Sequence, residues 1–332
     1  MTEAVYRPLV QQGEARPEAA LPLAGGPLWF THVERMRRTD TSLLDAEKVP
    51  DKVLQRLIAP RAPLAGLSLD RPRLMGILNT TPDSFSDGGL HAEQAAAVQA
   101  GRAMAAAGAD ILDVGGESTR PGAETVPVEE EIARTDPVIR SLRAELETPI
   151  SIDTRKAHVA RAALHAGANI INDVSGFTYD PDLTGEAATH KVPVCVMHAL
   201  GDPATMQNDP HYDNVVLDVW AFLEARVAAL ELAGVPRTRI LVDPGIGFGK
   251  TLDHNLTLLR HLSVFHGLGC AILLGASRKR FIGTIGQAPQ ARNRGPGSIA
   301  VGLAALAQGV QILRVHDVDA TAQAVRLWQA VR

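Results

Sequence analysis

The chain has 332 residues, of which 45% are hydrophobic and 21% charged, a composition typical of a soluble globular protein. The net charge of −4 and the 4% aromatic content give neither the basic surface nor the stacking platform of a nucleic-acid-binding protein. No apolar run approaches the roughly 20 residues that span a bilayer, and the N-terminus lacks the apolar segment of a secretory signal. Cys195 and Cys270 lie in apolar runs as expected for reduced thiols, so we expect a cytoplasmic protein without membrane or nucleic-acid partners.

Residues 1–73 differ in pattern from the rest of the chain. Prolines recur from Pro8 to Pro72, and no alternation of strands and helices is visible. Trp29 and Phe30 nevertheless form part of an apolar cluster, which needs a surface to pack against. We therefore expect an N-terminal extension that forms a small appended lobe or a wrapped arm.

From Leu74 to Arg332, short apolar runs alternate with longer amphipathic, Ala-rich stretches. Runs of this kind are typical of parallel strands buried on both faces. The expected strands are Leu74–Leu78, Ile111–Val114, Pro149–Ile152, Ile170–Ile171, Val192–Met197, Ile240–Val242, Ala271–Leu274 and Gln311–Val315. The expected helices include Glu93–Ala107, Lys156–Ala166, Asp213–Ala233 and Ser298–Gln308. About eight such units predict an α/β fold, a (β/α)₈ TIM barrel over residues 74–332. An open doubly wound sheet usually has fewer strands and a glycine-rich first turn, which is missing here.

Polar residues stand at or just after every expected strand. They are Asn79, Asp113, Asp153, Asn172, His198, Asp243, Ser277 and His316. Because catalytic groups of such barrels lie at the carboxyl ends of the strands, we expect these side chains to converge on one barrel mouth. His266, by contrast, is expected at the surface.

Three of these residues could read a heterocycle. Asp153, Asn172 and Asp243 offer carboxylate and amide groups, and a carboxylate accepts paired hydrogen bonds from a planar N–C–N edge. That chemistry suits a 2-amino-4-oxo heterocycle such as a pterin or guanine. The alternative for Asp153 is a helix N-cap ahead of Thr154.

The end of the last strand carries Arg314 and His316, which alternation places on the same side. An Arg and a His side by side suit a phosphate or diphosphate clamp, and Asn79 could supply a neutral oxygen ligand to Mg²⁺ on the same diphosphate. The alternative for Arg314 is a salt bridge with a strand-end Asp inside the barrel.

After the seventh strand comes Ser277-Arg278-Lys279, which we expect to open a helix and to hold a carboxylate through backbone amides and the Ser hydroxyl. Lys279 could reach back towards the site, or be a solvated surface lysine between Arg278 and Arg280. A Schiff-base role would need a drier position than this basic run offers.

These residues lie within stretches that resemble the dihydropteroate synthase family over the whole barrel. The stretches are MGILNTTPDSFSDGG (Met75–Gly89), DVGGESTRPGA (Asp113–Ala123), SIDT (Ser151–Thr154), IINDVSG (Ile170–Gly176), VMHALGDPATMQ (Val196–Gln207), LVDPGIGFGKT (Leu241–Thr251), LLGASRKRFIG (Leu273–Gly283) and RVHDV (Arg314–Val318). The first two are the most specific to that family. Thr80 and Ile246 replace residues more usual in it.

The resemblance implies a transferase of folate biosynthesis. Such an enzyme joins 4-aminobenzoate to (7,8-dihydropterin-6-yl)methyl diphosphate, with Mg²⁺ on the diphosphate. By resemblance, the pterin site would comprise Asp113, Asp153, Asn172, Met197, Asp243, Phe248, Gly275 and Lys279. The diphosphate would meet Asn79, Arg314 and His316, and the 4-aminobenzoate would meet Thr119, Arg120, Ser277 and Arg278. Asp153, Lys279, Arg314 and His316 would act in catalysis, and the resemblance favours a homodimer.

Two further readings remain open at this point. A methyltetrahydrofolate-dependent corrinoid methyltransferase would share the pterin-reading acids but not the diphosphate clamp. A non-catalytic pterin-binding paralogue would act through its N-terminal lobe, although Asn79, Arg120, Lys279 and His316 are all present. For the synthase we hypothesise that loops 80–89 and 116–123 close over diphosphate to build the second substrate's site.

Overall fold

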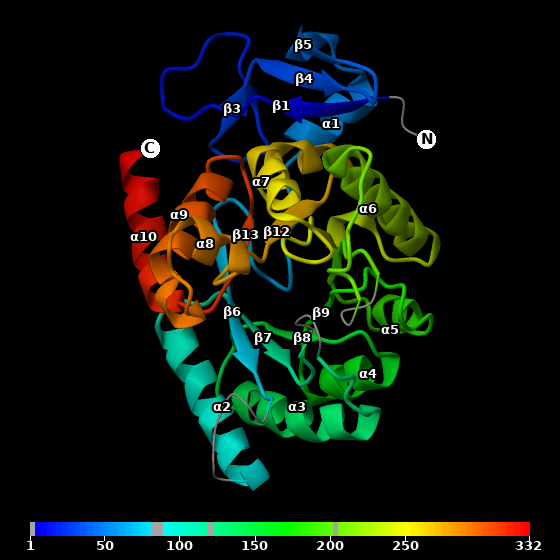
Figure 1. Ribbon diagram of the computed structural model, residues 1–332, viewed down its shortest axis with the longest axis vertical. Coiled ribbons are helices and arrows are strands. Elements are labelled where there is room, and N and C mark those ends of the chain that lie inside the picture. The colour runs from blue at the N-terminus through cyan, green and yellow to red at the C-terminus, as the bar shows by residue number, and fades with distance from the viewer. Residues whose placement is uncertain (1–3, 82–88, 119–122, 202–204) are drawn as a thin grey trace.

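The computed structural model describes residues 4–81, 89–118, 123–201 and 205–332, without the side chains of residues 89–92. Figure 1 shows two units, an N-terminal lobe stacked on one end of a barrel. The lobe comprises residues 4–58, residues 59–72 connect it to the barrel, and the first barrel strand begins at Arg73.

The barrel is a closed ring of eight parallel strands, so the predicted (β/α)₈ fold is confirmed. The strands are β6 (Arg73–Asn79), β7 (Ile111–Gly115), β8 (Ile150–Asp153), β9 (Ile170–Asp173), β10 (Val194–Met197), β11 (Ile240–Asp243), β12 (Ala271–Leu274) and β13 (Ile312–Val315). Each of the eight apolar runs in the sequence became one of these strands. They pair in chain order, and β13 closes the ring against β6 through pairs such as Arg314 with Met75.

Helices surround the ring and pack their apolar faces on the strands. They are α2 (Gly89–Ala106), α3 (Val128–Arg143), α4 (Ala157–Ala166), α5 (Leu183–His190), α6 (Val215–Leu232), α7 (Leu252–Arg260), α8 (Arg280–Ile285), α9 (Gly295–Leu306) and α10 (Val318–Val331). The short 3-10 turns are η3 (Arg237–Arg239), η4 (Leu262–Leu268) and η5 (Ala291–Asn293). Local sequence sets the ends of these helices. Asn214 caps α6 by accepting from two backbone amides, and Gly167 ends α4 at a φ of 114° that suits glycine.

The barrel interior is filled by alternate residues of the strands. One apolar cluster fills its N-terminal part and includes Met75, Ile111, Ile170, Cys195 and Leu241. Leu64 and Leu69, from the segment that connects lobe and barrel, belong to the same cluster and close the N-terminal end of the barrel. The opposite end, where the strands finish, is therefore the candidate site for substrates.

The lobe is a small antiparallel sheet with one helix. Strands β1 (Val5–Pro8), β4 (His32–Met36) and β5 (Thr41–Asp45) pair in the order β1-β4-β5, next to the two-residue strands β2 (Leu21–Pro22) and β3 (Trp29–Phe30). The turn η1 (Ala46–Lys48) leads into α1 (Asp51–Ile58). Phe30, Val33 and Leu57 are fully buried in the lobe's own core. The apolar cluster around Trp29 and Phe30 thus packs within a folded lobe.

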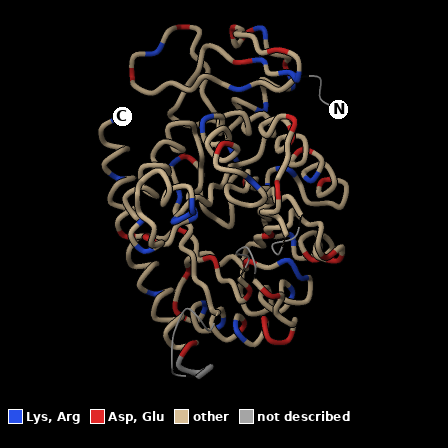
Figure 2. Tube along the Cα trace, viewed as in Figure 1, with Lys and Arg blue, Asp and Glu red and all other residues tan. Residues whose placement is uncertain are grey.

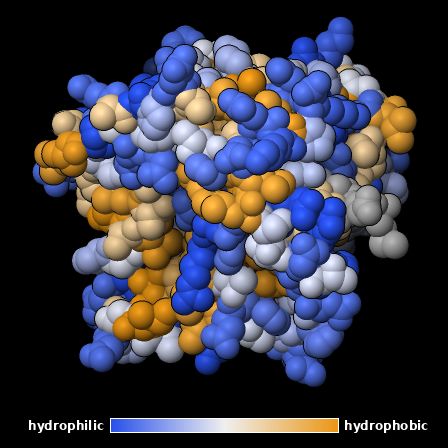
Figure 3. All heavy atoms as spheres, turned by 90° about the horizontal axis from the view of Figure 1, so that it is seen from above, coloured by the Kyte–Doolittle hydropathy of each residue, from blue (hydrophilic) through white to orange (hydrophobic). Residues whose placement is uncertain are grey.

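The lobe packs against η4 at the N-terminal end of the barrel. The Ser263 hydroxyl donates to the Pro8 carbonyl at 2.9 Å, and Arg38 pairs with Asp218 of α6 at 2.5 Å. His266, expected at the surface, is instead fully buried, because the turn that carries it lies beneath the lobe. Seen from the lobe side, hydrophilic and hydrophobic side chains intermingle on the surface (Figure 3).

Acidic and basic residues are interspersed along both units (Figure 2). Among the residues that the structure describes, no helix has the length and apolar character needed to cross a membrane.

Candidate active site

The barrel mouth is lined by the inward-facing residues at the ends of the strands. The register aligns Asn79 with Gly115, Gly115 with Asp153, Asp153 with Asn172, and Met197 with Asp243. His198 follows Met197 and by alternation faces outward, where its ring lies 4.8 Å from that of Phe222 on α6. The expectation that His198 joins the mouth is therefore wrong.

The centre of the mouth is an ion-paired network around Arg314. Its Nε donates to Asp113 Oδ2 and its Nη2 to Asp153 Oδ2, both at 2.6 Å, and Asn172 Nδ2 also donates to Asp113 Oδ2 at 3.1 Å. Asp153 does not cap α4, because its side chain bonds Arg314. The predicted diphosphate role of Arg314 stays a prediction, since its guanidinium here occupies the alternative position inside the barrel.

Two carboxylate oxygens of this network lack a hydrogen-bond donor among the described residues. Oδ1 of Asp113 and Oδ1 of Asp153 are buried, and neither meets a hydrogen-bond donor in the described part of the chain. Buried polar atoms of this kind usually have partners, so they call for donors from a bound molecule or from water. Burial, partly offset by the charge of Arg314, raises the pKa of Asp153 to about 7.

The loop after β11 forms one wall of the mouth. Asp243 Oδ1 accepts from the Gly245 amide at 2.7 Å, and its Oδ2 accepts from the Gly275 amide at 3.3 Å. Gly245 has a φ of +68°, and a Cβ there would lie 1.8 Å from the His198 carbonyl oxygen. Only glycine can therefore hold this turn, which fixes the Asp243 carboxylate. Burial raises the pKa of Asp243.

Lys279 reaches into the same wall. Its Nζ donates to the Ile246 carbonyl and lies 4.1 Å from the centre of the Phe248 ring, a cation–π distance. Burial lowers the pKa of Lys279 to about 7. The side chain is thus not a solvated surface lysine. It lies over Phe248 and near enough to Asp243 for the two charges to interact. That these residues share a pterin site with Gly275 stays a prediction.

Ser277 and His316 meet at the rim. The Ser277 hydroxyl lies 3.0 Å from His316 Nδ1 and 3.2 Å from the His316 amide. Arg278, at a φ of +56°, turns away from the mouth to pair with Asp317. Its guanidinium would have to leave Asp317 to reach a second substrate, whereas its backbone amide, bonded to Ser298 Oγ, shapes the rim.

Asn79 is the only protein ligand to Mg²⁺ that the sequence suggests. It ends β6 with a partly exposed side chain, and the described residues contain no cluster of three or more His, Cys, Asp or Glu that could hold a metal. Mg²⁺ is commonly held by few protein oxygens together with substrate phosphates and water. The donor set therefore fits an ion that arrives on a diphosphate.

Glu117 is a residue that the sequence reading missed. Its carboxylate accepts from Lys156 Nζ at 2.6 Å, from Arg155 Nη2 at 2.6 Å, and from the Val126 amide at 2.8 Å. Lys156 also donates to Glu131 at 2.6 Å, and all four charged side chains are buried. Although burial favours the neutral acid, these hydrogen bonds keep the pKa of Glu117 below its usual value. The cluster ties both ends of segment 117–126 to the residues that follow Asp153.

Thr119 and Arg120, expected to meet 4-aminobenzoate, lie outside the described residues, as does most of loop 80–89. The anchor at Glu117 lies two residues before Thr119. The charged residues themselves are visible in the sequence, because Glu117 stands within DVGGESTRPGA and Arg155-Lys156 follow SIDT. Their pairing could not be predicted, because ion pairs between loops follow no local spacing rule.

A second missed pair supports the Asp243 wall from behind. Buried Lys250 lies 2.9 Å from His198 Nδ1 and donates to the Phe248 carbonyl at 2.9 Å. Burial and the charge of Lys250 lower the pKa of His198 to about 2, so this imidazole is neutral. The pair joins the end of β10 to the loop that carries Phe248.

A closed (β/α)₈ barrel with acids, an amide and two partly buried cations at its mouth defines an enzyme that binds a polar, charged small molecule. The profile of the family described as pterin binding enzyme matches residues 75–316. The chain therefore belongs to the dihydropteroate synthase family of pterin-binding enzymes.

Two dihydropteroate synthases match this chain along nearly their whole length. The dihydropteroate synthase of Synechocystis is 48% identical over 261 residues, which are 79% of this chain and 90% of that protein. The Escherichia coli K12 enzyme is 46% identical over 269 residues, 80% of this chain and 93% of that protein. A Xanthomonas albilineans structure with 4-aminobenzoic acid is 50% identical, with a TM-score of 0.76, and covers 80% of this chain and 96% of its own. The residues before Met75 lie outside the family match.

Proposed function

We propose that this chain is a dihydropteroate synthase, a transferase that joins 4-aminobenzoate to (7,8-dihydropterin-6-yl)methyl diphosphate and releases diphosphate. One observation carries the proposal. The buried Oδ1 atoms of Asp113 and Asp153 face a mouth where a donor-rich heterocycle would satisfy both of them. A Xanthomonas albilineans relative with 48% identity and a TM-score of 0.73 has been solved in complex with 7,8-dihydropteroate.

The floor of the site would bind the pterin. The N–H groups of its N–C–N edge suit carboxylate acceptors, so Asp113, Asp153 and Asp243 would hold the ring together with Asn172. Lys279, Phe248, Met197 and Gly275 would border it. Because the wall at Asp243 is fixed by two backbone amides, it needs no rearrangement when the ring enters.

The reaction breaks the bond between the pterin methylene carbon and the diphosphate oxygen, whose electron pair leaves with the diphosphate. The aniline nitrogen of 4-aminobenzoate forms the new C–N bond and then loses a proton to solvent. The aniline nitrogen is uncharged at neutral pH, so it needs no strong base. Departure of the diphosphate is therefore the costly step, and the electron-rich pterin supports an S_N1-like path by delocalising the positive charge.

Charged side chains around the mouth would favour that departure. His316 and Arg314 would bind the diphosphate, and the Asp153 carboxylate would stabilise positive charge on the pterin methylene. This requires Arg314 to exchange part of its bonding to Asp113 and Asp153 for the diphosphate. Mg²⁺ held with Asn79 would neutralise further charge on the leaving group.

The 4-aminobenzoate site would lie at the rim, near Ser277 and the backbone of Arg278. Thr119 and Arg120 would complete it from the segment that Glu117 anchors. We propose that the 4-aminobenzoate site forms after diphosphate has bound. Binding of 4-aminobenzoate that needs no diphosphate would contradict that order.

We further propose a cytoplasmic homodimer. Cys195 and Cys270 are buried free thiols, which suits a reducing compartment. Leu327 and Val331 of α10 are 63% and 80% exposed, and such apolar side chains favour a protein contact. Light scattering after size exclusion would test the dimer.

An assay of diphosphate release separates this function from the two alternatives. Incubation with the dihydropterin diphosphate and 4-aminobenzoate should release diphosphate only when both substrates are present. A corrinoid methyltransferase would instead consume methyltetrahydrofolate, and a non-catalytic paralogue would bind pterin and release nothing.

A further inference from the structure

A cavity of about 250 Å³ lies between the N-terminal lobe and the N-terminal end of the barrel. Gln55, Arg56 and residues 59–62 line it from the lobe and its connection, and Ile240 and Ala271 line it from the first residues of β11 and β12. The substrate mouth is at the other end of the same strands. For comparison, an engineered apolar cavity of about 150 Å³ is large enough to bind benzene.

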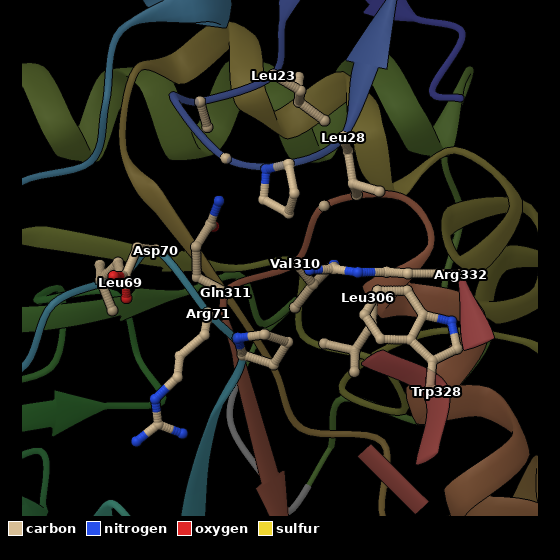
Figure 4. A pocket seen from close by; sticks show the side chains of 15 residues that line it. Leu23, Leu28, Leu69, Asp70, Arg71, Leu306, Val310, Gln311, Trp328 and Arg332 are labelled. Carbon is tan, nitrogen blue, oxygen red and sulfur yellow. The ribbon is translucent and has the colours of Figure 1, made fainter. Parts of the chain in front are cut away.

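A smaller pocket of about 40 Å³ lies nearby at the same junction, where Leu23 and Leu28 of the lobe face Leu306 and Trp328 (Figure 4). Its volume is about a sixth of that of the larger cavity. The larger cavity is therefore the one that could admit an organic ligand.

Three arginines line the larger cavity, and two of them have acidic partners. Arg56 pairs with Glu224 at 3.2 Å, and Arg237 pairs with Glu224 at 3.2 Å and with Glu231 at 2.6 Å. The three arginines and the two glutamates together carry one net positive charge. That charge belongs to Arg61.

Arg61 has no carboxylate partner among the described residues. Its Nη1 and Nη2 donate at 3.2 Å to the carbonyls of Ala59 and His266, and its buried Nε has no acceptor in the described part of the chain. Burial lowers the pKa of Arg61 to about 10, so the guanidinium remains charged at neutral pH. Arg61 is partly exposed, but its buried Nε still lacks an acceptor, and a desolvated charge is costly unless an opposite charge compensates it, so this site favours an anion.

The walls define what kind of anion would fit. Ala59, Pro60, Leu64 and Leu69 are among the apolar lining residues, and they offer no hydrogen bonds to a fully hydrated phosphate. A carboxylate with a short apolar body would place its charge at Arg61 and its body against these walls. Residues 55–62 precede the family match, so the cavity depends on a part of this chain that the family profile does not cover.

We propose that the junction between the N-terminal lobe and the barrel binds a small monocarboxylate with an apolar body, with Arg61 as its charge partner. Such a ligand contacts both units and therefore stabilises their packing. The site is separate from the barrel mouth and does not rest on the proposed synthase activity.

Calorimetry and thermal unfolding of the full chain with hexanoate test this proposal. Hexanoate should bind one site per chain and raise the unfolding temperature. Hexanamide, which lacks the charge, and inorganic phosphate, which lacks the apolar body, should bind at least roughly tenfold more weakly, as expected for loss of a charge-assisted contact.

Two variants locate the site. Arg61→Met should weaken hexanoate binding roughly tenfold or more, whereas Arg326→Met, which removes a charge from an exposed position on α10, should leave it unchanged. Ala62→Phe keeps Arg61 but fills the cavity, so it should abolish binding and carries the test if Arg61→Met does not fold. Absence of hexanoate binding to the unchanged chain would overturn the proposal. So would hexanoate binding by both cavity variants as tight as that of the unchanged chain, or binding of hexanamide or phosphate as tight as that of hexanoate.

Discussion

Arg314 Nη2 lies 2.6 Å from Asp153 Oδ2, although 161 residues separate the two in sequence. The same guanidinium holds Asp113 from its Nε atom. One cation at the end of the last strand therefore neutralises two acids from the second and third strands. The mouth can hold several carboxylates close together only because this arginine lies between them.

Replacing Arg314 tests this arrangement. Arg314→Met leaves two buried carboxylates without their cation, so we expect a loss of about 3–5 kcal/mol in the free energy of unfolding. Turnover should fall by roughly a hundredfold or more, because a charge that stabilises the leaving group is removed. Arg314→Lys keeps the positive charge but cannot bond both carboxylates from two separate nitrogens as the guanidinium does. This variant should therefore keep more of the stability than of the turnover. Urea unfolding and steady-state kinetics measure both, and a Met variant with unchanged kinetics would rule out a role in the reaction.

The pH dependence of stability tests the raised pKa of Asp153. Its pKa in the folded state is about 7, against 3.8 for an ordinary Asp, so the folded state binds the extra proton between these values. Stability from this group is therefore lost as the pH rises from about 4 to 7. Asp153→Asn cannot ionise, so the stability of the variant relative to the wild type should increase over this range. Urea unfolding at pH 5 and pH 8 gives the comparison, and a constant difference would show that Asp153 has an ordinary pKa.

Glu117 provides a test of the loop anchor. Glu117→Gln removes the charge that holds Lys156, Arg155 and the Val126 amide, so Glu117 and Val126 should no longer be tied to the residues after Asp153. We expect a severalfold higher KM for 4-aminobenzoate and little change in pterin binding. Glu124→Gln, an exposed change in the same segment, is the matched control. If both variants raise the KM equally, the anchor has no special role.

A pair of glycines tests the wall at Asp243. Gly245→Ala puts a methyl group 1.8 Å from the His198 carbonyl oxygen, which forces the turn to move. Gly234→Ala has a similarly positive φ of +94° but meets nothing within 4 Å. The Gly234 variant should therefore lose only about 1 kcal/mol of stability, whereas the Gly245 variant should lose more and also bind pterin weakly. Pterin affinity that is equal in the two variants would mean that the turn does not set the Asp243 position.

The barrel could be predicted because its strands are buried on both faces and are therefore continuous in apolar character. A small lobe was one of two expectations for residues 1–73, but its strands could not be predicted, because β2 and β3 have only two residues each and the sheet is antiparallel and interrupted by proline. Within the site, Asp243 was predictable from its place at a strand end. A salt bridge of Arg314 with a strand-end Asp was one of two alternatives, but the sequence could not name Asp113 and Asp153 as its partners, since no spacing rule gives the reach of a guanidinium across a barrel. His198 lies outside the mouth because it directly follows the inward-facing Met197, so strand alternation turns its ring towards Phe222 of α6.

The most direct test of the account is product formation by the purified chain. Given the dihydropterin diphosphate, 4-aminobenzoate and Mg²⁺, it should produce 7,8-dihydropteroate and diphosphate in equal amounts, as measured by chromatography and a diphosphate assay. Omission of either substrate should abolish the dihydropteroate. Failure to form it, while a folded chain still binds the pterin, would contradict the assignment of this barrel mouth as a synthase site.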